Sequence, residues 1–150
     1  MGRFHEACDG KGPTLTIIRV ETGRTIFAFA NAAWNSSGNY IIDHDNSSCI
    51  VLMGANCQRR RIPLTNKNYS IKGDQSFGPI FGDSDLRVEE GNILFTQLPS
   101  YYNDNLGDKC QKNFRLVTGV EEGQKCRILD YEVHQLFYPL DVSEIPLEDE

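Results

Sequence analysis

The chain has 150 residues, of which 39% are hydrophobic and 24% are charged. This composition indicates one soluble globular domain, large enough to bury roughly two-thirds of the surface that its unfolded chain exposes. A net charge of −6 argues against nucleic-acid binding, because a surface that follows phosphates needs clustered lysine and arginine. No apolar run approaches the ~18 residues of a membrane-spanning helix, so we expect no membrane insertion.

The N-terminal stretch predicts a short helix followed by a β-hairpin. Residues 3–8 fit the last turn of a helix that stops at an Asp-Gly pair. Apolar runs over Leu15–Val20 and Thr25–Ala32 flank a short turn that contains Gly23, and the second run leads to the only tryptophan, Trp34. The stretch has no apolar core of the kind found in secretory signals, so we expect a cytoplasmic protein.

The middle of the chain alternates between short apolar runs and polar connections. Cys49–Met53 is continuously apolar, which predicts a strand buried on both faces. Residues 54–68 are polar and basic and predict a long connection, in which Arg59–Arg61 form either a solvated loop or a local docking patch. Leu86–Val88 alternates like a strand, and Phe114–Val117 is another short apolar run.

The last strand is expected over Cys126–Leu136, where polar and apolar residues alternate. On a regular strand, Ile128, Asp130, Glu132 and His134 would share one face. Because no helical periodicity persists for ten residues and Gly/Pro turns are frequent, the chain is predicted to be mainly β. We expect a two-sheet antiparallel β-sandwich with one or two short flanking helices.

Few residues suggest catalysis or metal binding. Asp83, Asp85 and Glu89 could form a calcium site, or the two aspartates could cap turns around a tight glycine loop. The three histidines have neither i,i+4 nor HxH spacing, which favours surface or hydrogen-bonded side chains over ligands. We therefore expect no bound metal and no cofactor.

The five cysteines show no CxxC spacing and no Cys/His ligand spacing. Ordinary reduced thiols are the simplest interpretation. Cys8 is a candidate redox thiol only if it lies near a positive charge such as Arg3 or Lys11.

Four segments occur in an order that resembles the TLDc domain. The first, FHEACDGKGPTLTIIRVETGRTIFAFANAAWNSSGNY, contains a GPTL-type strand start, and Cys49–Met53 follows where the family has an apolar strand. FGPIFGDSDLRV, over Phe77–Val88, is similar to the family's GP-x-FG…DL segment, and DYEVHQL, over Asp130–Leu136, to its terminal strand. His134 stands where that strand normally has an aromatic residue. The sequence also resembles TLDc versions joined to BTB-type proteins and to relatives of interferon-induced GTPases.

The resemblance implies a single domain over residues 1–138 that lacks the family's N-terminal segment, followed by an acidic, proline-containing tail over residues 139–150. It implies a β-sandwich that acts as a non-enzymatic protein-interaction domain in protection against oxidative stress. The expected partner is a vacuolar-type proton ATPase subunit or a larger multiprotein assembly. The expected location is the cytoplasm, on an organelle surface or within a cytoskeletal assembly. A redox-active thiol domain and a calcium-dependent or lectin-like sandwich stay open as alternatives.

Individual residues follow from the matched motifs. Those expected to shape the backbone are Gly12, Pro13, Gly78 and Gly82. Those expected at a binding surface are Trp34, Asn35, Phe77, Phe81, Asp85 and Glu132. Asp85 and Glu132 are also expected to have structural roles, Asp85 in turn hydrogen bonds and Glu132 in a buried or edge polar network.

Overall fold

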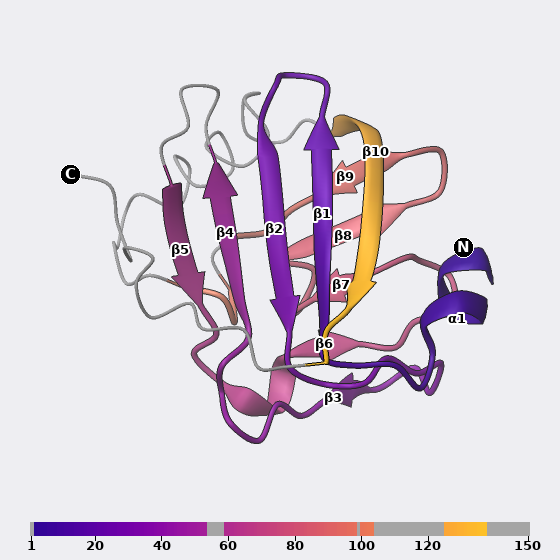
Figure 1. The fold of residues 1–150 in the computed structure, drawn as a ribbon, viewed down its shortest axis with the longest axis vertical. Coiled ribbons are helices and arrows are strands. Elements are labelled where there is room, and N and C mark those ends of the chain that lie inside the picture. The colour runs from indigo at the N-terminus through magenta and orange to yellow at the C-terminus, as the bar shows by residue number, and fades with distance from the viewer. Residues whose placement is uncertain (1, 54–58, 99, 104–124, 138–150) are drawn as a thin grey trace.

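The computed structural model describes residues 2–53, 59–98, 100–103 and 125–137 (Figure 1). Within these residues the strands form one continuous antiparallel order, β3-β6-β7-β8-β9-β10-β1-β2-β4-β5. The order folds over on itself at β10, so that five strands lie in front of the others in Figure 1. The mainly β, two-layered antiparallel fold is as predicted.

The first layer is made of long strands with regular pairing. Thr14 at the start of β1 pairs with Gln135 of β10, and Ile18 pairs with Ile26 of β2. The strands of this layer are β10 (Cys126–Gln135), β1 (Thr14–Val20), β2 (Thr25–Ala30), β4 (Cys49–Met53) and β5 (Arg59–Pro63).

The second layer has shorter strands and shares β10 with the first. Cys126 at the start of β10 pairs with Leu94 of β9. The other strands are β3 (Tyr40–Ile41), β6 (Ile71–Lys72), β7 (Ile80–Phe81), β8 (Leu86–Glu89) and β9 (Ile93–Phe95). Helix α1 (Gly2–Cys8) lies beside β10, and a 3-10 turn, η1 (Lys67–Tyr69), precedes β6 (Figure 1).

The hydrophobic core lies between the two layers because most of the inward side chains of the strands are apolar. Along β1, buried residues alternate with half-buried ones over its whole length. β4 is buried on both faces, as predicted: Ile50 and Leu52 join the main core, whereas Cys49 and Val51 join a second cluster with Phe29. Fully buried residues from both layers include Ile18, Ile26, Ile50, Ile71, Phe81, Leu86 and Leu94.

The predicted N-terminal elements are confirmed. The helix ends at Cys8, and Gly10 has a positive φ of 80°, a conformation that favours glycine. The β1–β2 turn closes through the N–H of Gly23, which donates to the carbonyl of Val20 at 3.0 Å.

The arginine run is a strand rather than a solvated loop, so this part of the prediction was wrong. Arg59–Pro63 forms β5 and pairs with β4 along its whole length. Arg60 and Ile62 are buried, whereas Arg59 is exposed. Charged residues are common on edge strands, where they discourage pairing with other chains. Because one of the two buried positions of β5 is an arginine, the sequence lacks the alternation of apolar and polar residues that predicts a strand.

The faces of β10 also differ from the prediction because the strand contains a β-bulge. Along β1, Arg19 pairs with Asp130 but the next residue pairs with Ile128, which leaves Leu129 as the extra residue. Ile128 is buried and Asp130 is exposed, so the two do not share a face. The residues of β10 that contact the core are Cys126, Ile128, Tyr131 and Val133. The expected run at Phe114–Val117 and the tail over residues 139–150 lie outside the described residues.

Candidate functional site

Trp34 lies in the core, at the junction between α1 and the two layers. Its Nε1 donates to the hydroxyl of Thr14 at 2.9 Å. Its ring makes edge-to-face contacts with Phe4 and Phe81, with centroids 5.0 and 5.5 Å away. Trp34 and Phe81 are both almost completely buried, so these two expected binding residues act beneath the surface.

Gly12 and Pro13 precede β1 at a point where the chain lies very close to the backbone of Ala33. A Cβ at Gly12 would lie 2.8 Å from the Cα of Ala33, closer than side-chain carbons normally approach backbone. The carbonyl of Pro13 accepts from the N–H of Leu136 at 2.9 Å, one residue beyond β10. The motif therefore joins the start of β1 to the end of the last strand.

His5 is buried and ties α1 to two loops. Its Nδ1 lies 2.8 Å from a carboxylate oxygen of Asp9, and its Nε2 lies 2.8 and 3.1 Å from the carbonyl oxygens of Asp74 and Phe77. The hydroxyl of Ser36 donates to the other carboxylate oxygen of Asp9. This histidine is a hydrogen-bonded structural residue, and it fixes the backbone of Phe77.

Asn35 lies in the loop next to Ser36 and is half-buried. Its side-chain oxygen accepts from the N–H and the hydroxyl of Ser37, at 3.1 and 2.8 Å. Gly73 approaches so closely that a Cβ there would lie 2.9 Å from the carbonyl carbon of Asn35. Asn35 therefore shapes a loop that packs on the segment before Phe77.

Phe77 belongs to a half-exposed cluster on the outer face of the second layer. The guanidinium of Arg87 lies 4.4 Å from the ring centroids of both Phe77 and Phe95. Glu89 accepts from Arg87 at 2.5 Å and from Lys125 at 2.7 Å. Burial alone would raise the pKa of Glu89, but these two hydrogen bonds outweigh it and hold the pKa below its usual value. We call Phe77, Arg87 and Phe95 the arginine sandwich.

Asp85 is fully buried and organises the backbone around it. Its carboxylate accepts from the N–H groups of Asp83, Ser100, Tyr101 and Tyr102, at 3.1, 2.7, 3.3 and 3.0 Å. Burial raises the pKa of Asp85 to about 6, although the backbone hydrogen bonds oppose the rise.

Two motif glycines precede Asp85 in the chain. Gly82 has a positive φ of 64°, and a Cβ there would overlap the carboxylate of Asp85. The N–H of Gly78 donates to the carbonyl of Val88 at 2.9 Å, which joins the loop to β8. The FG…DL motif therefore encodes a turn built around a buried acceptor.

A comparison with protein-family models adds to this geometry. The model of the TLDc domain matches residues 1–137. The chain belongs to the TLDc domain family. No curated protein matches the chain. No helix in the described residues is long and apolar enough to cross a membrane.

Glu132 lies on the exposed face of β10 in this TLDc domain. It accepts from Arg19 at 3.0 Å and lies 2.8 Å from Nε2 of His134. Asp130 accepts from the same arginine nitrogen at 2.8 Å. The hydrogen bonds from His134 and Arg19 lower the pKa of Glu132. Glu132 therefore belongs to a surface ladder of charges that joins β1 to β10.

The three carboxylates considered for a calcium site bind different partners. Asp83 accepts from the hydroxyl of Tyr40, Asp85 accepts from backbone N–H groups, and Glu89 pairs with Arg87 and another cation. Across the described part of the TLDc domain, no three His, Cys, Asp or Glu side chains group as metal ligands do.

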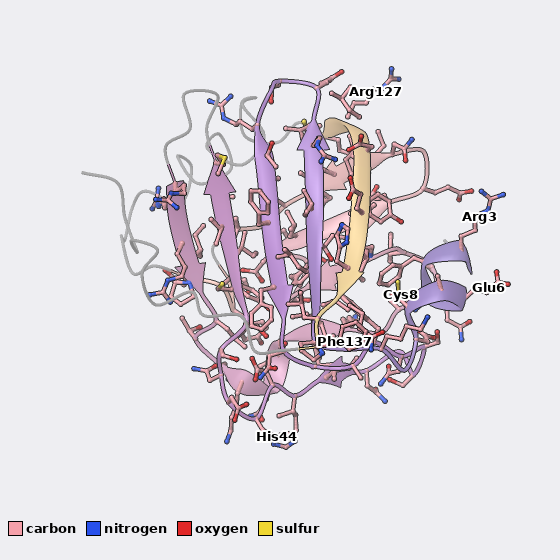
Figure 2. The ribbon with its side chains drawn as sticks, in the orientation of Figure 1. Arg3, Glu6, Cys8, His44, Arg127 and Phe137 are labelled. Carbon is pink, nitrogen blue, oxygen red and sulfur yellow. The ribbon has the colours of Figure 1, made fainter. Side chains whose placement is uncertain are left out.

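The described thiols lie in environments that disfavour the reactive thiolate. Burial raises the pKa of Cys8 more than Lys11 lowers it, and it raises the pKa of Cys49 to about 11 and that of Cys126 as well. Figure 2 shows Cys8 on the side of α1 that faces β10, while Arg3 points away. The other cysteines, Cys57 and Cys110, lie outside the described residues.

Proposed function

We propose that this TLDc domain is a non-enzymatic protein-interaction domain that docks through the arginine sandwich. The observation that carries the proposal is the guanidinium of Arg87, held 4.4 Å from two half-exposed phenylalanine rings. Aromatic residues and arginine are enriched at the centres of protein interfaces, where they supply much of the binding energy.

The arginine sandwich is rigid before any partner arrives. Arg87 is held by both rings and by Glu89, and the loop that carries Phe77 is held by His5. A surface that is already ordered loses less side-chain entropy on binding, which favours affinity.

The residues expected at a binding surface divide into two groups. Phe77, Asn35 and Glu132 are at least partly exposed and are available to a partner. The buried ones, Trp34, Phe81 and Asp85, are not available to a partner. Glu132 lies on the opposite layer from the arginine sandwich, so we place it outside the proposed docking surface.

Family membership supports the choice of partner. We propose a subunit of the vacuolar-type proton ATPase, bound on the cytoplasmic surface of an organelle, and a role in protection against oxidative stress. A larger multiprotein assembly would use the same surface.

Binding of the purified proton ATPase to the immobilised full chain, measured by biolayer interferometry, tests the proposal. Phe95→Ala should weaken binding about tenfold or more, because it removes one wall of the arginine sandwich. Phe137→Ala is the matched control: this phenylalanine is 84% exposed and does not belong to the arginine sandwich, so its affinity should equal that of the wild type. Absence of wild-type binding, or equal affinities for all three proteins, would refute the proposal. Thermal melting of each variant separates lost binding from lost folding.

A further inference from the structure

Three tyrosines from distant parts of the chain form a second half-exposed cluster, which we call the tyrosine cluster. Tyr40 comes from β3, Tyr69 from η1, and Tyr101 from the segment after β9. The rings of Tyr69 and Tyr101 are stacked, with centroids 4.2 Å apart and planes 11° apart. Tyr40 meets Tyr69 edge to face at 4.9 Å.

Hydrogen bonds, among them two to buried groups of the core, hold the tyrosine cluster in place. The carboxylate of Asp85 accepts from the N–H of Tyr101 at 3.3 Å. The buried hydroxyl of Tyr102 donates to the carbonyl of Ser70 at 2.7 Å, next to Tyr69. The hydroxyl of Thr65 donates to the carbonyl of Tyr101 at 2.9 Å. The surface rings are therefore supported by bonds from the interior, as in a preorganised binding site.

The chemistry of the tyrosine cluster suits a cation. The ammonium of Lys72 already lies 5.2 Å from the ring centroid of Tyr40, so these rings accept a positive charge. The exposed carboxylate of Asp83 accepts from the hydroxyl of Tyr40 at 2.6 Å and places a negative charge at the rim. The net charge of −6 favours the approach of a positively charged partner.

The arginine sandwich differs from the tyrosine cluster in whether a cation already contacts its rings. Arg87 already occupies the space between its rings, whereas among the described residues no cation lies over the ring of Tyr69 or Tyr101. Stacking covers one face of Tyr69 and one face of Tyr101, so a cation from another molecule would contact the outer faces of this stack.

We propose that the tyrosine cluster docks a lysine- or arginine-bearing segment of a protein partner. The inference rests on the proposed function, because it names the chemistry of a second contact made by the same interaction domain. The partner's cationic side chain would lie over the exposed tyrosine rings, within reach of the Asp83 carboxylate.

Titration of the full ¹⁵N-labelled chain with hexa-lysine, followed by NMR, tests the inference. Hexa-lysine should shift the amide signals of Tyr40, Tyr69, Tyr101 and Asp83, and hexa-glutamate should not. Asp83→Asn should weaken hexa-lysine binding about two- to fivefold. Tyr101→Ser should abolish these shifts, whereas Tyr101→Phe, which keeps the ring, should retain them.

Other outcomes overturn the inference. The inference fails if millimolar hexa-lysine causes no shift, if hexa-glutamate causes equal shifts, or if the shifts are confined to Glu132 and the charged residues next to it. The unchanged indole signal of Trp34 shows that each variant is folded. The result is independent of the proton ATPase experiment. If the wild type does not bind the proton ATPase but shows the hexa-lysine shifts, the proposed function fails and this inference stands; the opposite pair of results overturns this inference alone.

Discussion

Replacing Asp85 with alanine removes the buried acceptor of four backbone N–H groups. Hydrogen bonds to a charged group contribute about 1.5–3 kcal/mol each. The pKa of about 6 is the net result of burial and these hydrogen bonds, and it shows that the folded chain disfavours the charged form of Asp85 by about 3 kcal/mol at pH 7. Because alanine leaves these N–H groups without their acceptor, and each buried donor left unpaired costs about 1–3 kcal/mol, we expect the unfolding free energy to fall by about 3 kcal/mol.

Urea denaturation followed by the fluorescence of Trp34 measures this loss, since the only tryptophan is buried in the folded core. In a thermal melt the same change should lower the midpoint by roughly 6–12 °C. Asp83→Ala is the matched control, because this aspartate is two residues away and exposed. A variant at position 85 as stable as the wild type, or a control equally damaged, would contradict the role of the buried carboxylate.

The pH dependence gives an independent check. The folded pKa of Asp85, about 6, lies above the ordinary value of 3.8, so the folded chain holds this proton more tightly than the unfolded chain does. The part of the stability that depends on this proton is therefore fully present below pH 3.8 and is lost as the pH rises through about 6, whereas the hydrogen bonds to the carboxylate remain at higher pH. The stability difference between the wild type and Asp85→Ala should be larger at pH 4 than at pH 7. A difference that grows with pH would show that the pKa is lowered instead.

Three further changes test other parts of the structure. Gly12→Ala should lower the unfolding free energy by roughly 3 kcal/mol because the added Cβ would collide with backbone atoms. Gly91→Ala is the control: its Cβ meets no atom within 4 Å, so it should cost only about 1 kcal/mol, for its positive φ. Equal losses in the two variants would refute the steric argument. His5→Ala should cost about 2–4 kcal/mol by removing three hydrogen bonds, one to a carboxylate and two to carbonyls, while His44→Ala, exposed in Figure 2, should leave the melting midpoint unchanged. The Cys49 thiol, with its pKa near 11, should react with iodoacetamide at pH 7 more than about tenfold slower than an unfolded thiol, as measured by mass spectrometry, and an equal rate would contradict its burial.

Several elements could be predicted because their signals are local. The hairpin of β1 and β2 has its turn glycine and both apolar runs within one short stretch. Cys49–Met53 is apolar at every position, and it is indeed buried on both faces. Such patterns depend on few neighbouring residues, so they can be recognised without knowledge of the tertiary structure.

Other elements depend on neighbours that sequence alone does not reveal. β5 forms a strand because it pairs with the open edge of β4. Its three arginines do not suggest a strand in the sequence. The bulge at Leu129 reverses the alternation of β10, and no residue type marks it.

The candidate site was found only in part. Phe77 followed from the matched motif, but Arg87 and Phe95 became its partners only when the register of β8 and β9 was known. The tyrosine cluster unites residues from three segments, none of which stands out alone. A buried tryptophan and an exposed one look the same in sequence, which is why Trp34 was expected at a surface.

The shared strand β10 has a consequence for how the chain folds as it is synthesised. β1 leaves the ribosome well before β10, so one of its edges stays unpaired until Cys126–Gln135 has emerged. Contacts between segments so far apart in sequence raise the contact order and slow folding. Until then β1 presents an apolar, open edge on which a chaperone could act. Completion of the domain is therefore tied to the arrival of its last strand, which closes both layers in one step.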